Sequence, residues 1–241
     1  MGLIQTTLAA IYPPRCLGCG STVDSDFGLC GACWGQTAFI GGASCDACGA
    51  PVPGSVQDED LHCDACLKTP RPWAHGRAAL TYTGMGRKLV LGLKHGDRQE
   101  VARPAAVWMQ ASLGDIVDPR TLIVPVPLHW TRLAKRRYNQ SALIAMELSK
   151  LTGLDWCADL LQRTRRTPSL DGKSPTERSD ALSGAIAIAP KRRHRIQSRP
   201  VLLVDDVMTT GATLAACATA CGASGADHVC VSVLARAVKD H

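Results

Sequence analysis

The chain has 241 residues, of which 46% are hydrophobic, and a formal net charge of +6. No apolar run approaches the roughly 20 residues that a membrane-spanning helix needs, and the first ten residues lack the basic segment and cleavage site of a signal peptide. The composition therefore argues against an integral membrane protein. We expect a cytoplasmic chain made of one domain and a small module.

Charge is divided unevenly along the chain. Residues 1–66 contain one basic and seven acidic residues, a net charge of −6, whereas residues 67–241 contain 26 basic and 14 acidic residues, a net charge of +12. Because a polyanion is attracted to positive potential, we expect a nucleic acid or a phosphorylated ligand to meet the C-terminal part first.

Paired cysteines dominate the N-terminal part. Residues 1–12 have the apolar spacing of a short helix, which two prolines would end. Ten residues separate the first two cysteine pairs, and fourteen separate the last two. Eight of the twelve cysteines form these Cys-x-x-Cys pairs: Cys16 and Cys19, Cys30 and Cys33, Cys45 and Cys48, Cys63 and Cys66.

Each Cys-x-x-Cys pair forms a tight turn that directs two sulfur atoms to one point, and two such turns complete a tetrahedral zinc site. Two structural Zn²⁺ ions are therefore the interpretation we favour over redox dithiols, and an iron–sulfur site is a less favoured alternative. Pairing in sequence order is the simplest arrangement, although the spacing also allows the two sites to exchange turns. We expect residues 1–70 to form a double zinc-ribbon module and residues 71–241 to form a second domain.

The second domain begins with alternating strand and helix patterns. Apolar periodicity predicts strands at 77–82 and 121–126 and helices at 85–94 and 101–113. Lys94 and Arg98, where the first of these helices ends, are candidates for phosphate binding, with solvated surface cations as the alternative. Continuous apolar strands separated by helices are typical of a parallel sheet covered on both faces.

A proline-rich turn follows the strand at 121–126. Its prolines preset the backbone so that N–H groups can turn outward, which favours anion binding around Pro127, Leu128 and His129. For His129 the alternative is a structural place in the turn. A basic cluster that begins with Arg132 follows. It is either a solvated face or an anion-binding surface beside this turn, for which single-stranded nucleic acid is a competing partner.

The pattern then continues to the C-terminus. Residues 141–151 read as a helix that Asn139 is placed to cap. The segment 163–180 is long and polar, which is typical of a lid over a site or of disorder. Strands are expected at 185–189 and 228–234.

The most informative stretch runs from Val201 to Thr213. Four branched apolar residues predict a strand buried on both faces, and two carboxylates, Asp205 and Asp206, follow it. Because buried unpaired carboxylates are costly, we expect this strand to end in a crevice. A helix expected at 214–221 would direct its N-terminus to the same place.

The turn between the acids and this helix suits a phosphate. A glycine lets the backbone approach closely, the threonines add hydroxyl donors, and the helix N-terminus offers free N–H groups. The carboxylates can accept hydrogen bonds from vicinal sugar hydroxyls, directly or beside Mg²⁺. Together these groups fit a sugar with a 5′-phosphate and free 2′- and 3′-hydroxyls. The turn consists of Val207, Met208, Thr209, Thr210, Gly211, Ala212 and Thr213.

This stretch, four apolar residues followed by Asp-Asp-Val-Met-Thr-Thr-Gly-Ala-Thr, resembles the phosphoribosyl diphosphate (PRPP) motif of type I phosphoribosyltransferases. With Tyr-Pro-Pro-Arg-Cys-x-Gly-Cys-Gly at 12–20, Val-Pro-Val-Pro-Leu-His at 124–129 and Tyr-Asn-Gln-Ser-Ala at 138–142, nearly the whole chain resembles the ComF (ComFC/GntX-like) competence family. The resemblance implies a type I phosphoribosyltransferase fold, a parallel sheet flanked by helices, joined to a double zinc ribbon. It also implies cytoplasmic handling of single-stranded DNA during natural transformation, with competence-machinery proteins as possible partners.

The resemblance also assigns residue roles. Asp205 and Asp206 would be the catalytic acids, and the segment from Val207 to Thr213 would bind PRPP with Mg²⁺. The turn from Pro127 to His129, with Arg132, resembles the pyrophosphate loop of the amidophosphoribosyltransferase branch. Arg178 matches an arginine of the family's closing loop by its place in the sequence.

Three functions follow from these expectations. The first is a phosphoribosyltransferase, in which an acceptor that the sequence does not identify displaces pyrophosphate from PRPP. The alternative is a non-catalytic module that binds single-stranded DNA or senses PRPP. A purely structural adaptor is the third, for which the zinc ribbons are the positive feature.

Overall fold

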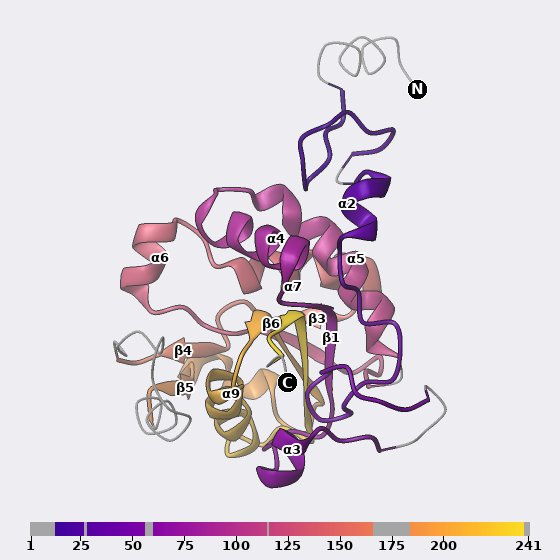
Figure 1. Cartoon of the computed structure of the whole chain (residues 1–241). Coiled ribbons are helices and arrows are strands. Elements are labelled where there is room, and N and C mark those ends of the chain that lie inside the picture. Colours follow the sequence, from indigo (N-terminus) through magenta and orange to yellow (C-terminus); the bar gives the residue numbers. More distant parts are fainter. Residues whose placement is uncertain (1–12, 27, 56–59, 115, 166–183, 239–241) are drawn as a thin grey trace.

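The computed structural model describes residues 13–26, 28–55, 60–114, 116–165 and 184–238. At its centre is a five-stranded sheet in the order β1-β7-β6-β2-β3, in which all neighbouring strands are parallel (Figure 1). The strands are β1 (Gly76–Thr81), β2 (Leu122–Pro125), β3 (Asp155–Trp156), β6 (Val201–Met208) and β7 (Val229–Arg236). The α/β class with a parallel sheet, expected from the sequence, is confirmed.

Strand β6 lies in the middle of the sheet, between β7 and β2. Its first half, Val201–Val204, pairs on both sides and is fully buried. The pairing with β2 ends where Val204 meets Pro125, but the pairing with β7 continues to Met208. Residues 205–208 therefore have a strand neighbour on one side only. The strand is longer than its apolar run predicted, because β7 extends the ladder past the two acids.

Three helices cover one face of the sheet. Figure 1 shows them above the strands, and their buried residues Leu89, Met109 and Ile144 share a core with Leu202 and Val204. Because side chains alternate across a strand, Leu202 and Val204 of β6 face these helices. The helices are α4 (Gly84–His95), α5 (Ala102–Leu113), which follows the short 3-10 helix η1 (Gln99–Val101), and α7 (Gln140–Thr152).

Helix α9 (Ala212–Gly222) covers the opposite face. It buries Leu214, Cys217 and Cys221 in a second core with Val201 and Leu203, the odd-numbered residues of β6. The same core receives side chains from a small antiparallel sheet and from the region of a 3-10 helix. These elements are β4 (Leu161–Arg163), β5 (Ile186–Ile188) and η2 (Pro190–Arg195).

Most elements expected from apolar periodicity are present within a few residues of their expected bounds. The sequence did not indicate β3, β4 or α6 (Trp130–Arg136), because each is too short to show a period. The strand expected at 185–189 is β5, but it pairs with β4 outside the main sheet. The helix expected at 1–12 and most of the long polar segment, residues 166–183, lie outside the described residues.

The first cysteine ribbon, residues 13–40, contains α2 (Gly31–Gly35) and rests on helix α4. Its Cys16 and Cys33 are buried in the same core as Met85 of α4. At Gly18 a Cβ atom would lie 2.6 Å from Cys33 Sγ, so a larger residue would displace a cysteine sulfur.

The second cysteine ribbon, residues 43–66, contains α3 (Asp64–Lys68) and packs directly on β1. A Cβ atom at Gly49 would lie 2.5 Å from the amide nitrogen of Ala78, and one at Gly76 would lie 2.5 Å from the carbonyl oxygen of Ala47. This ribbon therefore shares the core of α9. The division into a double zinc-ribbon module at 1–70 and a second domain at 71–241 stays a prediction.

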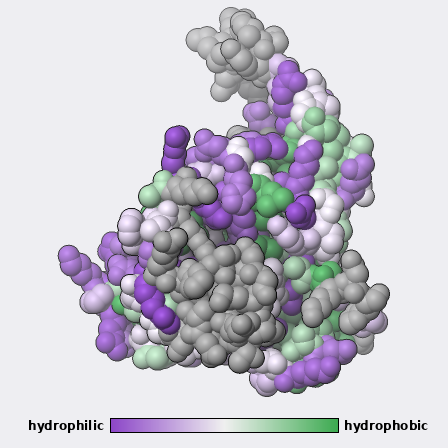
Figure 2. Space-filling view, turned by 60° about the vertical axis from the view of Figure 1, so that its left-hand side comes forward, coloured by the Kyte–Doolittle hydropathy of each residue, from purple (hydrophilic) through white to green (hydrophobic). Residues whose placement is uncertain are grey.

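Few large apolar side chains of the described residues are exposed. Within the described ranges, no helix combines the length and the apolar character needed to cross a membrane. In the coloured part of Figure 2, hydrophilic residues lie beside apolar areas. Among the described residues, Trp130 on α6 is the most exposed aromatic side chain, at 70%.

Candidate functional site

The carboxyl ends of β2 and β6 lie side by side, and the chain leaves them in opposite directions. After β2 it continues to α7 on one face of the sheet, and after β6 it continues to α9 on the other. In α/β proteins such a reversal leaves a crevice at the carboxyl ends of the strands, where ligands bind. Both loops that the sequence singled out begin at this crevice.

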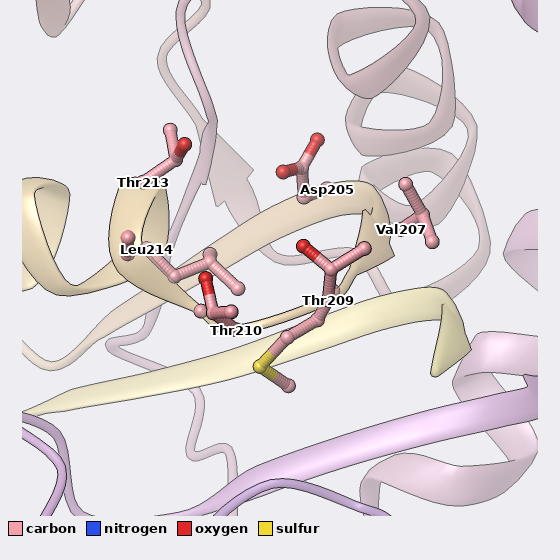
Figure 3. Close-up of a pocket in the computed structure, with 9 residues that line it drawn as sticks. Asp205, Val207, Thr209, Thr210, Thr213 and Leu214 are labelled. Atoms are coloured by element: carbon pink, nitrogen blue, oxygen red, sulfur yellow. The ribbon is translucent and has the colours of Figure 1, made fainter. Parts of the chain in front are cut away.

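A pocket of about 50 Å³ lies there, lined by Asp205 and by residues 207–214. Figure 3 shows the carboxylate of Asp205 and the hydroxyls of Thr209, Thr210 and Thr213 facing the same space. Pockets that enclose a whole ligand hold roughly 300–1,000 Å³. The described walls therefore enclose one small group, such as a phosphate.

The turn into α9 depends on Gly211. Its φ is +82°, in the left-handed region that glycine adopts without strain. A Cβ atom there would also lie 3.2 Å from Trp73 and 3.3 Å from Arg71 Nη1. As the N-cap of α9, Gly211 leaves the first amide groups of the helix at the pocket, where they favour an anion.

Asp205 is held from two sides. Its Oδ1 accepts hydrogen bonds from Ser141 Oγ at 2.7 Å and from the amide nitrogen of Asp206 at 2.9 Å. Burial, and then the negative charge of Asp206, raise the pKa of the Asp205 carboxyl to about 7. A bound cation or two hydroxyl donors would stabilise the ionised carboxylate, so we expect ligand binding near neutral pH to release the proton.

Asp206 has a different environment. It is one residue further along β6, so its side chain points to the opposite face of the sheet. There it forms an ion pair with Lys94 of α4, at 3.0 Å between Nζ and Oδ1, with side-chain exposures of 17% for Lys94 and 6% for Asp206. Asp205 lines the pocket together with the whole predicted segment from Val207 to Thr213, but Asp206 does not.

The proline loop begins beside the same strand. The amide of Val126 donates to the carbonyl of Val204, and Asn139 Nδ2 donates to the carbonyl of Val126 at 3.0 Å. Pro127 and Leu128 follow at once. His129 is 6% exposed and caps α6, because its Nδ1 accepts from the amide of Thr131. His129 therefore caps the helix that follows the turn, and its contact with a pyrophosphate stays a prediction.

The other cations that the sequence suggested for phosphate or pyrophosphate binding lie on different segments of the chain. Arg132 belongs to α6, whereas Arg178 lies outside the described residues. Lys94 is engaged by Asp206, and Arg98 donates to Glu100 and to the carbonyl of Leu17. Neither Lys94 nor Arg98 lines the pocket.

The eight paired cysteines form two four-sulfur clusters. Within each cluster all four sulfur atoms lie within 4.8 Å of one another, and the measured separations of Cys19 from Cys30 and of Cys48 from Cys63 are both 3.7 Å. Zn–S bonds of about 2.3 Å place the sulfurs of a tetrahedral site about 3.8 Å apart, so the geometry fits zinc. The turns pair in sequence order. The first cluster is Cys16, Cys19, Cys30 and Cys33, and the second is Cys45, Cys48, Cys63 and Cys66.

Three residues at the site had no predicted role. Ser141 binds Asp205, while Arg71 and Arg236 donate to carbonyls of the turn before α9. Ser141 belongs to the Tyr-Asn-Gln-Ser motif, which was the one available signal. No pattern near Arg71 or Arg236 in the sequence predicts their contacts with the turn before α9.

Comparison with solved structures finds partial similarity to phosphoribosyltransferases. Glutamine PRPP amidotransferase from B. subtilis has a TM-score of 0.39 at 17% identity, covering 60% of this chain and only 30% of that chain. A hypoxanthine phosphoribosyltransferase from Staphylococcus aureus has a TM-score of 0.32 at 14% identity, covering 61% of this chain and 69% of that chain. TM-scores this low do not support a shared fold, so the α/β class is assigned from the order and direction of the strands.

Sequence comparison is more informative. The double zinc ribbon domain model matches residues 7–67. DNA utilization protein YhgH of Escherichia coli K12 is 30% identical over 218 residues, which cover 87% of this chain and 91% of the relative. Competence protein F of Haemophilus influenzae is 28% identical over 229 residues, which cover 92% and 97%. Because this similarity extends over most of each chain, the protein belongs to the ComF family, which includes competence protein F and DNA utilization protein YhgH.

Proposed function

We propose that this protein is a phosphoribosyltransferase-type protein that binds PRPP with Mg²⁺ beside Asp205. The proposal rests on one observation: a carboxylate and a threonine-lined helix N-terminus face one small pocket. The printed names of the relatives, competence protein F and DNA utilization protein, support a role in the uptake or use of DNA.

In this proposal each part of the crevice binds one part of the ligand. The 5′-phosphate accepts hydrogen bonds from the amides and hydroxyls of Thr209–Thr213. Asp205 accepts hydrogen bonds from the ribose hydroxyls or coordinates Mg²⁺, which prefers carboxylate, phosphate and water oxygens. The loop of Pro127, Leu128 and His129 lies nearest to the pyrophosphate.

An acceptor then displaces pyrophosphate at C1 of the ribose. Such a reaction depends on positioning the reactants and on stabilising the charge that develops on the ring and on pyrophosphate. Asp206 does not touch the ligand in this scheme. It positions Lys94 and supplies negative charge behind Asp205, so we assign it a positioning role.

The test is calorimetric titration of Mg–PRPP into the wild type, Asp205→Asn and Asp159→Asn. Asp159 is a matched surface control, 57% exposed and paired with Arg192. Loss of one charged hydrogen-bond acceptor is expected to weaken binding about tenfold or more in Asp205→Asn, with no change in Asp159→Asn. A wild type that does not bind Mg–PRPP, or equal affinity in Asp205→Asn, would contradict the proposal. Pyrophosphate release with candidate acceptors then separates an enzyme from a PRPP sensor.

A second candidate function is binding of single-stranded DNA without catalysis. Two observations favour it: residues 67–241 carry a net charge of +12, and Trp130 on α6 is 70% exposed. An exposed aromatic ring beside cations is the usual platform on which unpaired bases stack.

Oligonucleotide titrations at several salt concentrations test this alternative. If α6 stacks bases, Trp130→Ala weakens binding about 5- to 100-fold, as expected for the loss of one stacking platform. Trp34→Ala is the control, because Trp34 is 51% exposed but lies in the acidic first ribbon. Equal losses in the two variants would count against a platform on α6. A steep salt dependence without any PRPP binding would favour this function over the first.

A further inference from the structure

Arg71 joins the second cysteine cluster to the phosphate loop, which we define as Thr209–Thr213. Its Nε donates to Cys66 Sγ at 3.3 Å, and its Nη1 donates to the carbonyl oxygen of Thr210 at 2.7 Å. The guanidinium is planar and rigid, so a shift of the sulfur is passed on to the carbonyl. The group also lies over the ring of Trp73, 5.7 Å from its centroid, which limits its other positions.

Arg236, at the end of β7, holds the residue just before the phosphate loop and the first residue of the loop. It is 6% exposed, and its Nη1 donates to the carbonyls of Met208 and Thr209 at 3.2 and 2.7 Å. Arg71 and Arg236 therefore hold consecutive carbonyls of the same turn, and Arg71 is the one that also contacts the cluster.

These contacts orient the loop. In a trans peptide the N–H group points opposite to the preceding carbonyl. The carbonyls of Met208, Thr209 and Thr210 point toward the arginines. The N–H groups of Thr209, Thr210 and Gly211 therefore point away from the arginines, and successive N–H groups that share a direction form an anion-binding concavity.

A Cys₄ zinc centre carries a net charge of −2 that N–H donors compensate. We propose that zinc in the second cluster holds Arg71 in place and thereby sets the anion-binding conformation of the phosphate loop. Zinc at the cluster and a phosphate ligand at the loop then favour each other's binding. The ligand part of this inference rests on the function proposed above, whereas the effect on the loop does not.

The first cluster provides an internal control. Its ribbon packs on α4, and the arginine that holds it is Arg98, whose Nη1 donates to the carbonyl of Leu17 at 2.7 Å. Leu17 lies between two ligands of that cluster, far along the chain from the phosphate loop. Arg98→Ala therefore removes a comparable contact from the other ribbon.

The test compares the wild type with Arg71→Ala, Arg71→Lys and Arg98→Ala, each loaded with ¹¹³Cd in both clusters. Cadmium NMR gives a separate signal for each thiolate cluster, and variant assignments distinguish them. We expect Mg–PRPP to shift the signal of the second cluster in the wild type and in Arg98→Ala, but not in Arg71→Ala. In the zinc protein, Arg71→Ala is expected to lower PRPP affinity by about fivefold or more. Arg71→Lys keeps the charge but has one nitrogen, so it is expected to behave like Arg71→Ala.

Hydrogen exchange of the ligand-free protein provides a readout that needs no ligand. Peptides that contain Thr209–Thr213 are expected to exchange faster in both Arg71 variants than in Arg98→Ala. If the wild type binds PRPP and neither the second-cluster signal nor loop exchange responds to Arg71→Ala, the inference is wrong and the proposed function stands. If PRPP does not bind, the proposed function fails, and loop exchange alone decides the inference. If Arg71→Lys behaves like the wild type, then the positive charge of residue 71 acts on the loop and the two hydrogen bonds of Arg71 do not. That result would also overturn the inference.

Discussion

At the scale of single residues, Asp205 is the group whose chemistry depends most on its surroundings. A carboxyl with an ordinary pKa near 4 is brought to about 7 by burial and by the charge of Asp206, while Ser141 and Lys94 act in the opposite direction. The two acids are adjacent in sequence but face different sides of the sheet. The first faces the pocket, and the second holds Lys94.

The raised pKa of Asp205 predicts a pH dependence of stability. Between its ordinary value and about 7 the folded protein binds a proton that the unfolded chain has released, so stability falls as pH rises. The slope from this group is at most about 1.4 kcal/mol per pH unit. In urea titrations from pH 5.5 to 7.5, the wild type is therefore expected to lose stability relative to Asp205→Asn. Parallel pH profiles for the two proteins would contradict this prediction.

At the scale of elements, Asn139 joins two segments of the crevice. Its Oδ1 accepts from the amide of Ser141 at 3.1 Å and caps α7, while its Nδ2 donates to the carbonyl of Val126 at the start of the proline loop. Ser141, in the first turn of the same helix, donates to Asp205. The start of α7 therefore holds both the proline loop and the acid that lines the pocket.

Two substitutions at Asn139 separate these contributions. Asn139→Ala removes both hydrogen bonds and is expected to cost about 1–3 kcal/mol of unfolding free energy. Asn139→Asp keeps the cap but loses the donor to Val126, so it is expected to be more stable than Asn139→Ala. Denaturant titration measures both. If the aspartate variant is no more stable than the alanine variant, then the cap is not what stabilises α7.

At the scale of the whole molecule, the two ribbons are integrated differently. The first packs on α4, and its Cys19 is exposed, whereas Cys48 of the second is 0% exposed within the core that α9 shares. Close backbone contacts at Gly49 and Gly76 attach the second ribbon to the edge of the sheet. The second cluster is therefore part of the core that supports the proposed site.

This difference predicts unequal effects of metal loss. Elemental analysis of freshly reduced protein is expected to give about two zinc ions per chain. Cys48→Ser is expected to lower the free energy of unfolding by about 3 kcal/mol or more beyond the effect of Cys19→Ser, because it removes a ligand inside the main core. Thermal unfolding of the two variants measures this. Equal losses would mean that the second ribbon does not stabilise the sheet.

Local sequence determined much of this protein. The apolar run with Asp-Asp and the threonine turn specified a strand, a turn and a helix, because each depends on residues a few positions apart. The four Cys-x-x-Cys turns likewise identified eight metal ligands. For the same reason β3, β4 and α6 were missed, since so short a segment leaves no period to read.

Only the tertiary structure decided how these parts meet. β7 extends past β2 along β6, and this pairing determines that Asp205 faces the pocket while Asp206 faces α4. The structure also decided that the cysteine turns pair in sequence order, which their spacing left open. The contact of Arg71 with Thr210 spans 139 residues of chain. No local pattern encodes such a contact, because it exists only after the sheet has brought both segments to the same edge.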